Sequence, residues 1–268
     1  MSVQTLYTAA TGMDSLQTKL DVIANNLANI NTTAFKRDRA NFEDLFYRKE
    51  KLPGMLDSAG QITAVGTQIG LGSTVQSTQI DFNQGAFQQT SRPLDIAIEG
   101  HGFLQVIDGA SGNTLFTRSG NLSINANGDL VVGSAQVGRV LDPSINIPPD
   151  TTAISIGADG QVFVAQPNNP SLTPVGQLLL SAFQNPQGLL KLGENMYSQT
   201  DASGQPIQAT PGTQGLGQIR QNALEASNVE PVTELIDLIT TQRAFELNSQ
   251  AIQAGDQILQ LVGNLRRF

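Results

Sequence analysis

The chain lacks cysteine and tryptophan, and it has one histidine, His101. Without cysteine there is no disulfide, no thiolate zinc site and no thiol nucleophile. A single histidine excludes multi-histidine metal sites, and the glycines on either side of His101 are typical of a surface turn. We therefore expect no bound metal and no cofactor.

Long apolar runs are also missing. No stretch approaches the roughly 20 apolar residues that a membrane-spanning helix needs, so we expect no direct membrane insertion. The N-terminus does not resemble a secretory signal, because no basic residue precedes Lys19 and polar residues interrupt its apolar positions. Taken alone, this pattern predicts a soluble cytoplasmic chain, unless an export route leaves the N-terminus uncleaved.

Basic side chains are scarce in the middle of the chain. Residues 52–218 hold four basic residues against eleven acidic ones, and this segment carries nearly all of the net charge of −8. Proteins that bind nucleic acid need clustered lysine and arginine to neutralise phosphates. We therefore expect no nucleic-acid partner.

Catalytic motifs are absent as well. There is no phosphate-binding Walker loop, no His-Glu-x-x-His and no Gly-x-Ser-x-Gly. The segment Asn125–Asp129 loosely resembles a calcium loop but lacks the closing acidic ligand, and a hairpin turn explains it. Acidic residues are scattered singly, so a two-carboxylate hydrolase site has no support. We expect no catalytic residue and no enzymatic activity.

Two interleaved seven-residue apolar repeats run through the N-terminus. They consist of Leu6, Met13, Leu20 and Leu27 and, three residues later in each heptad, Ala9, Leu16, Ile23 and Ile30. Such a pattern over four heptads is typical of a coiled coil. It predicts a helix from about Val3 to Ile30, roughly 40 Å long, whose apolar stripe needs a partner.

The C-terminus predicts a second, longer helix. Pro231 suits the first helical position, and the helix is expected to run to about Leu265. Its apolar residues fall into two registers, Leu247, Ala251, Ala254, Ile258, Leu261, Leu265 and Phe268 in one, and Leu238, Phe245, Ile252 and Leu259 in the other. The N-terminal helix can cover only one register, so we expect helices from other copies to cover the second.

The middle of the chain predicts β-structure. Asn127-Gly128 and Asp159-Gly160 are strong hairpin signals, and repeated prolines preclude long helices. Short runs of period two favour strands at residues 94–98, 103–107 and 130–132. The fold class is therefore α+β, with N- and C-terminal helices forming a coiled-coil layer around an inserted antiparallel β-domain.

The stretch Tyr47–Leu71 fits neither pattern. It contains Pro53, Gly54, Gly60 and Gly66, and its apolar residues have no clean period, so we expect an extended or hairpin segment. Long stretches of this kind are usually functional or ordered by a partner. The expected domains are the helical ends at 1–46 and 219–268, this segment at 47–71, and the β-domain at 72–218.

Several motifs resemble those of the flagellar rod and hook protein family. They span almost the whole chain and comprise Asn25–Lys36, Arg92–Phe103, Leu115–Gly120, Ser227–Leu235, Thr241–Glu246 and Ser249–Ala251. Ala34 departs from the family, which commonly has glycine there, and alanine could stiffen that turn. The C-terminal motifs are most similar to those of the distal rod members of the family.

The resemblance implies a structural subunit that polymerises with itself into a rigid, tubular distal rod around the export channel. It implies contacts with proximal rod subunits, hook subunits, and the peptidoglycan (P) and outer-membrane (L) bushing rings. It also implies flagellar type III export without a cleaved signal, and assembly in the periplasm. The stretch Tyr47–Leu71 matches in position the family's stiffening insert.

Other functions remain open at this point. Within the family, the chain could be a hook or proximal rod subunit. Outside it, a secreted coiled-coil fibre would share the helical ends and β-rich middle, but it would normally carry a signal peptide. A carbohydrate-processing enzyme would need converging carboxylates in the β-domain.

Overall fold

The computed structural model describes residues 3–54, 65–109, 112–136, 138–167 and 169–265, and it divides into two compact units. The helical unit contains Met1–Ala28, Asp38–Ile80 and Glu230–Phe268. The β-rich unit contains Asn29–Arg37 and Asp81–Val229. The chain therefore passes between the units four times. The predicted α+β class is confirmed.

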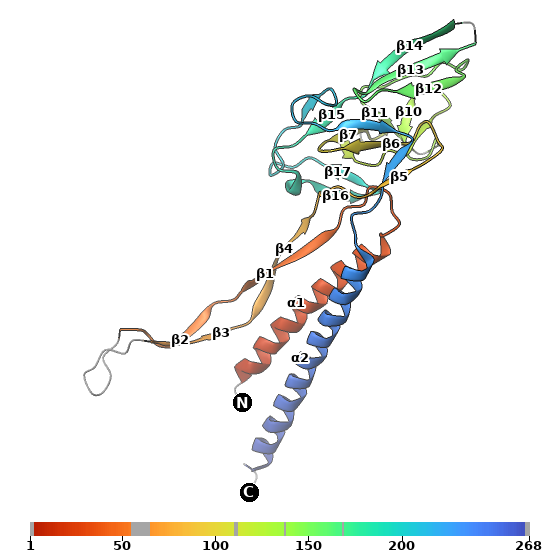
Figure 1. Cartoon of the computed structure of the whole chain (residues 1–268). Helices are drawn as coiled ribbons and strands as arrows, with labels where there is room; N and C mark the ends of the chain where they lie inside the picture. The colour runs from red at the N-terminus through yellow and green to blue at the C-terminus, as the bar shows by residue number, and fades with distance from the viewer. Residues whose placement is uncertain (1–2, 55–64, 110–111, 137, 168, 266–268) are drawn as a thin grey trace. The chain divides into compact units, whose positions relative to one another are not determined.

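Two antiparallel helices, α1 (Val3–Ala28) and α2 (Pro231–Leu265), lie side by side in the helical unit (Figure 1). Two contacts define their direction. Asn26 Nδ2 lies 3.3 Å from Glu234 Oε2, and a Cβ atom on Gly12 would lie 3.3 Å from Asn248 Nδ2. Within the described residues, neither helix combines the length and apolarity that crossing a bilayer requires.

Both predicted helices are present, but α1 ends at Ala28, two residues before the predicted end. The backbone N–H of Thr32 donates to the Asn29 carbonyl at 3.1 Å, which closes a turn in place of another helical residue. Ile30 therefore does not belong to the helical stripe. Ala34 follows at φ 58°, in the left-handed region that favours glycine, which gives a physical reason for glycine at this position in the family.

A long two-stranded antiparallel ribbon completes the helical unit. β1 (Asp38–Asp44) pairs with β4 (Ser73–Ile80), and further along the same ribbon β2 (Tyr47–Lys51) pairs with β3 (Thr67–Gly70). The ribbon is longer than the predicted segment Tyr47–Leu71. Its first strand was not predicted because it lacks a regular alternation of apolar and polar residues.

The β-rich unit consists of short antiparallel strands and one turn of 3-10 helix, Pro186–Gly188. The strands are β5 (Phe87–Gln89), β6 (Ile96–Glu99), β7 (Phe103–Ile107), β8 (Thr114–Thr117), β9 (Leu122–Ile124), β10 (Leu130–Val132), β11 (Arg139–Leu141), β12 (Ala153–Ile156), β13 (Gln161–Gln166), β14 (Asn169–Gln177), β15 (Leu180–Ala182), β16 (Leu190–Gly193), β17 (Met196–Ser198), β18 (Ile207–Ala209), β19 (Gln218–Gln221) and β20 (Ala223–Glu225).

The largest sheet of this unit follows the order β16-β17-β8-β7-β11-β10-β9, and β15 pairs with both β7 and β18. β12, β13 and β14 form a three-stranded sheet, and two smaller pairs join β19 to β6 and β20 to β5. The core is aliphatic and includes Leu104, Val106, Leu122 and Leu130, each at most 1% exposed. This core packs the strands of the β-rich unit together.

The predicted strands and hairpins are confirmed, with a shift of the first strand. The run expected at 94–98 is the strand β6, one to two residues later in the chain. Turns at Asn127-Gly128 and Asp159-Gly160 connect the paired strands β9 to β10 and β12 to β13. Residues 219–229, expected in the helical part, belong to the β-rich unit because β19 and β20 pair with its strands.

Candidate functional site

One apolar stripe of each helix is covered within the helical unit. On α1 the stripe is half-buried or buried, and its described members are Leu6, Ala9, Met13, Leu16, Leu20, Ile23 and Leu27. On α2 the seven-spaced register Leu238, Phe245, Ile252 and Leu259 is half-buried. It lies on the same face as Glu234 and Asn248, which contact α1. Within the helical unit, α1 therefore covers one of the two apolar registers of α2.

The second register of α2 stays open to solvent. Leu247 is 65% exposed, Ile258 is 37% exposed and Leu261 is 64% exposed. Ala251 and Ala254 are exposed between them, while the side chain of Leu265 and all of Phe268 lie outside the described residues. A stripe of this length on one helix is an unsatisfied packing surface, since each buried leucine or isoleucine is worth about 1.5–3 kcal/mol.

Sequence reasoning missed one member of this stripe. Ile236 is 56% exposed, and it precedes Leu247 by eleven residues, as Leu247 precedes Ile258. Eleven residues are close to three turns of an α-helix, so the three side chains lie nearly in line along the helix. The eleven-residue spacing could have revealed Ile236, but the heptad pattern of the covered face obscured this spacing.

The ribbon carries a second set of exposed apolar side chains. Phe46 is 88% exposed and Val65 is 82% exposed, and Tyr47, Leu52, Ile69 and Leu71 are also open to solvent. A hydrogen bond to Asp44 raises the pKa of the Tyr47 hydroxyl. A two-stranded ribbon is at best marginally stable in water without a packing partner. The ribbon is therefore a second exposed apolar surface of the helical unit.

The predicted stiffening residues occupy different places along this ribbon. Tyr47 begins β2, and Leu71 follows β3. Pro53 and Gly54 form an exposed turn beyond β2, and a Cβ atom on Gly66 would collide with Lys51 and Pro53. Gly60 lies outside the described residues. The structure thus brings the described members onto one ribbon.

A groove of about 480 Å³ lies where α1, α2 and the ribbon meet within the helical unit. Small residues line much of it, including Ala9, Gly12, Gly70 and Gly72. Gly12 lets α2 approach α1, and Gly72 lets the ribbon approach α1, because a Cβ atom there would collide with the Thr11 side chain. Because these glycines have no side chains, the three elements can lie close together.

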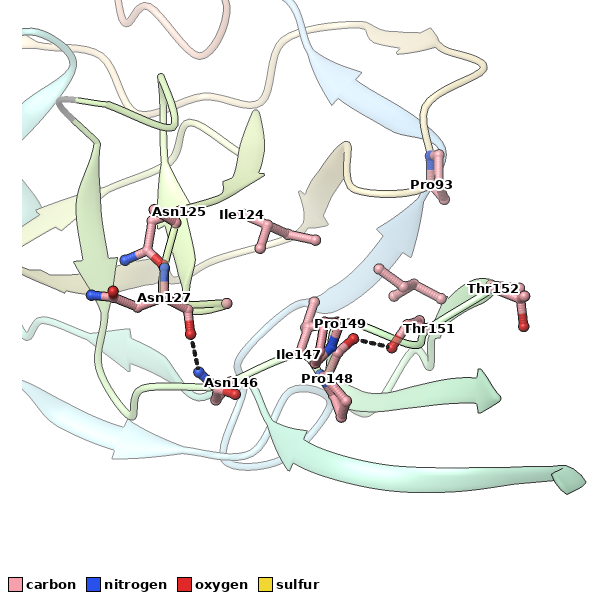
Figure 2. Close-up of a pocket in the computed structure, with 14 residues that line it drawn as sticks. Pro93, Ile124, Asn125, Asn127, Asn146, Ile147, Pro148, Pro149, Thr151 and Thr152 are labelled. Atoms are coloured by element: carbon pink, nitrogen blue, oxygen red, sulfur yellow. Dashed lines mark hydrogen bonds between the residues drawn. The ribbon is translucent and has the colours of Figure 1, made fainter. Parts of the chain in front are cut away.

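One cavity of the β-rich unit is lined by backbone groups and uncharged side chains. Figure 2 shows a cavity of about 460 Å³ whose lining residues include no acidic, basic or histidine side chain. Its polar groups bond to the chain itself, because Asn146 Nδ2 donates to the Asn127 carbonyl at 2.8 Å and Thr151 Oγ1 donates to the Pro148 carbonyl at 2.7 Å. This cavity could therefore contact a ligand through its shape and its backbone groups, but its lining residues supply no acidic or basic side chain for catalysis.

Another cavity, of about 650 Å³, contains two carboxylates that share one cation. Arg139 Nε lies 3.2 Å from Asp108 Oδ1, and Arg139 Nη1 lies 2.6 Å from Glu194 Oε2. The bond to Glu194 raises the pKa of Arg139, so the guanidinium stays charged. Among the residues that the structure describes, no group of three or more potential ligands could hold a metal ion.

Three family models match separate parts of the chain. "Flagella basal body rod protein" matches residues 6–36, "Flagellar hook protein FlgE/F/G D1 domain" matches residues 97–164, and "Flagellar basal body rod FlgEFG protein C-terminal" matches residues 220–265. The first and last models cover α1 and α2, and the middle one covers strands of the β-rich unit. The matches therefore extend over both units.

Relatives align along nearly their whole length. The flagellar basal-body rod protein FlgG of Agrobacterium fabrum is 44% identical over 97% of this chain and 98% of its own. FlgG of Buchnera aphidicola (subsp. Schizaphis graminum) is 42% identical over 98% and 100% of the two chains. FlgG of Bacillus subtilis is 38% identical over 99% and 100%.

Proposed function

Because this chain belongs to the family of flagellar basal-body rod proteins, we propose that it is a distal rod subunit that polymerises into a rigid tubular drive shaft. The resemblance to this family is thereby confirmed, and the role as a structural rod subunit follows from it. The observation that carries the proposed mechanism is the open stripe of α2, which another copy of the chain would cover.

In the proposed assembly, each copy contributes the α1–α2 pair to an inner layer around the export channel. The covered register holds the pair together, as in a two-helix coiled coil, and the open register packs against the next copy. Repetition of this contact along the shaft adds about 1.5–3 kcal/mol for each leucine or isoleucine that becomes buried. The β-rich unit supplies the outer part of the subunit.

Introduction of negative charge into the open stripe tests this assembly. We expect Leu247→Asp combined with Leu261→Asp to fold as a monomer but to form no tubes, because both side chains are exposed in the single chain. Gln253→Asp is the matched control, since Gln253 is exposed on α2 and belongs to neither register. Electron microscopy of the purified proteins gives the result, and tubes of wild-type length from the double variant would contradict the mechanism.

The ribbon is proposed to supply stiffness. Its exposed apolar residues, including Phe46 and Tyr47, would pack between neighbouring subunits and oppose the sliding that a flexible hook requires. This reading favours a rod subunit over a hook subunit. Straight tubes in electron micrographs would support it, and curved ones would indicate a hook-like polymer.

We place the subunit in the distal rod, between the periplasm and the outer membrane, after export without a cleaved signal. Its proposed neighbours are proximal rod subunits, hook subunits and the P and L bushing rings. The role is mechanical and requires no catalysis, metal or cofactor. Cross-linking of assembled basal bodies followed by mass spectrometry would identify these neighbours.

A further inference from the structure

Four polar side chains meet inside the β-rich unit close to the points where the chain leaves it. We call Lys36, Arg118, Glu225 and Asn228 the clamp. Lys36 is 0% exposed, Arg118 is 3% exposed and Glu225 is 2% exposed. Buried charges of this kind are costly unless they are paired and hydrogen-bonded. Each of these buried charged side chains therefore needs bonded partners inside the unit.

Glu225 is the centre of the clamp. One carboxylate oxygen lies 2.6 Å from Lys36 Nζ, and the other lies 3.1 Å from Arg118 Nε. The backbone N–H of Gly85 also donates to Glu225 Oε1 at 3.0 Å. Lys36 Nζ donates in addition to the Asn83 carbonyl at 2.7 Å. The two ion pairs and these hydrogen bonds thus join four segments of the chain, around Lys36, residues 83–85, Arg118 and Glu225.

Asn228 joins three of these segments, all except that of Arg118, a second time. Its Oδ1 accepts from the backbone N–H of Arg37 at 2.8 Å, and its Nδ2 donates to the carbonyls of Asp81 at 2.8 Å and Asn83 at 3.1 Å. The backbone N–H of Asp81 donates directly to the Arg37 carbonyl at 2.8 Å. Every group that Asn228 can offer as donor and acceptor is therefore directed at another segment.

These segments are the connections to the helical unit. The chain passes between the units after Arg37, before Asp81 and after Val229, and these are three of its four crossings. Arg118 anchors the clamp to the sheet, because its guanidinium donates to the carbonyls of Gly100 and Gly102, each at 3.0 Å. The crossings are thus bonded to one another and to the body of the β-rich unit.

We propose that the clamp is a load-sharing device, which distributes a force applied through any one connection over all three and over the sheet behind them. Without it, each connection would pull on a single strand end, and the sheet could open strand by strand from its edge. The relevance of the device to torque rests on the proposed rod function. The clamp would distribute force in a single isolated chain as well.

Constant-force optical tweezers on the full-length chain, held by its two ends, test the claim. Once α1 and α2 separate, the force enters the β-rich unit at Asn29 and Val229, on either side of the clamp. We expect Lys36→Met and Asn228→Ala each to raise the unfolding rate of this unit about tenfold, which is about 1.4 kcal/mol of the unfolding barrier, because each removes at least two hydrogen bonds that join the connections. Lys36→Met leaves the Arg118–Glu225 pair neutral and is expected to fold.

Asn146→Ala is the matched control, because Asn146 also makes two side-chain bonds in the β-rich unit, at 2.8 and 3.0 Å, but none to a connection. We expect it to unfold at the wild-type rate. If one clamp variant does not fold, the other decides the outcome. Wild-type unfolding rates in a folded clamp variant would overturn the proposal, and a failure to form rods would not bear on it.

Discussion

Asn26 in the helical unit and Asn228 in the β-rich unit tie separate chain segments together in the same way. Asn26 accepts from the backbone N–H of Asp38 and donates to its carbonyl, both at 2.9 Å, and it also lies 3.3 Å from a Glu234 oxygen. A side-chain amide can do this because it carries a donor and an acceptor. Aspartate would keep only the acceptor, so neither position tolerates that exchange without loss of bonds.

Lys36 gives the protein a measurable pH dependence. Burial lowers the pKa of Lys36 below 10.5, and the nearby Arg118 cation lowers it further, against the opposing effect of Glu225. In the window between that lowered pKa and 10.5, the unfolded chain binds the proton more tightly than the folded chain. The free energy of unfolding therefore rises with pH in this window and is constant with respect to Lys36 below it.

Lys36→Met should abolish this rise. Urea denaturation at several pH values compares the variant with the wild type, and the difference in slope isolates the one side chain. Lys49→Met serves as the control, since Lys49 is exposed on the ribbon. Equal slopes for the wild type and Lys36→Met would contradict the stated shift.

Gly72 should be more sensitive than a turn glycine to gaining a side chain. Its φ is 126°, and a Cβ atom would collide with the Thr11 side chain on α1. We expect Gly72→Ala to destabilise the helical unit by about 1–3 kcal/mol, through backbone strain and loss of the contact between the ribbon and α1. Hydrogen exchange along β4 measures the detachment.

Gly54→Ala is the matched control for this contact. Gly54 also has a positive φ, 85°, but nothing lies within 4 Å of the position of its Cβ atom. Both variants carry backbone strain, and only Gly72→Ala carries the collision. Equal hydrogen exchange along β4 in the two variants would show that the contact with α1 contributes nothing.

At the scale of whole elements, α2 presents two apolar faces, one covered and one exposed. Its covered register pairs with α1, and its open register, which includes Leu247 and Leu261, remains exposed. A helix that is apolar on two sides has too few partners in its own chain. Its second face is the surface that we propose another copy of the chain covers.

Deletion of Tyr47–Leu71 tests the proposed role of the ribbon. We expect the shortened protein to form tubes that bend, because β2 and β3 with their exposed apolar residues are removed while β1 and β4 stay paired. A control replaces only residues 52–66 by Asn-Gly, a two-residue turn that joins the paired residues Lys51 and Thr67. Straight, rigid tubes from the longer deletion would contradict the proposal.

Much of this architecture was predictable from local pattern. The heptads reveal both helices, and turn pairs such as Asn127-Gly128 reveal the hairpins, because these signals depend on nearby residues. The first strand of the ribbon was missed, since Asp38–Asp44 is mostly polar and its partner residues lie 29 to 42 positions further along the chain. The clamp was missed for a similar reason: Lys36, Arg118 and Glu225 are far apart in sequence, and no periodicity connects them.

At the scale of the whole molecule, charge opposes association. The net charge is −8, and it is concentrated in the middle of the chain. Copies that pack side by side bring like charges together, and salt screens such repulsion over about 10 Å at 0.1 M ionic strength. Assembly through apolar stripes should therefore become easier as salt increases.

We expect the critical concentration for tube formation to fall between low salt and about 0.5 M sodium chloride, since apolar contacts persist while repulsion is screened. Sedimentation of polymer at each salt concentration gives this value. An increase in the critical concentration would instead indicate that ion pairs between subunits dominate the assembly.

The antiparallel pairing of α1 and α2 places the first turn of α1 and the last turn of α2 at the same end of the helix pair (Figure 1). A short glycine-serine linker could therefore join Phe268 to Met1. New ends could then be opened in the turn between β7 and β8, near Asp108. Such a circular permutant would keep α1 paired with α2 while its new ends lie in the β-rich unit. It would show whether assembly requires α1 and α2 to end freely or only requires the folded pair.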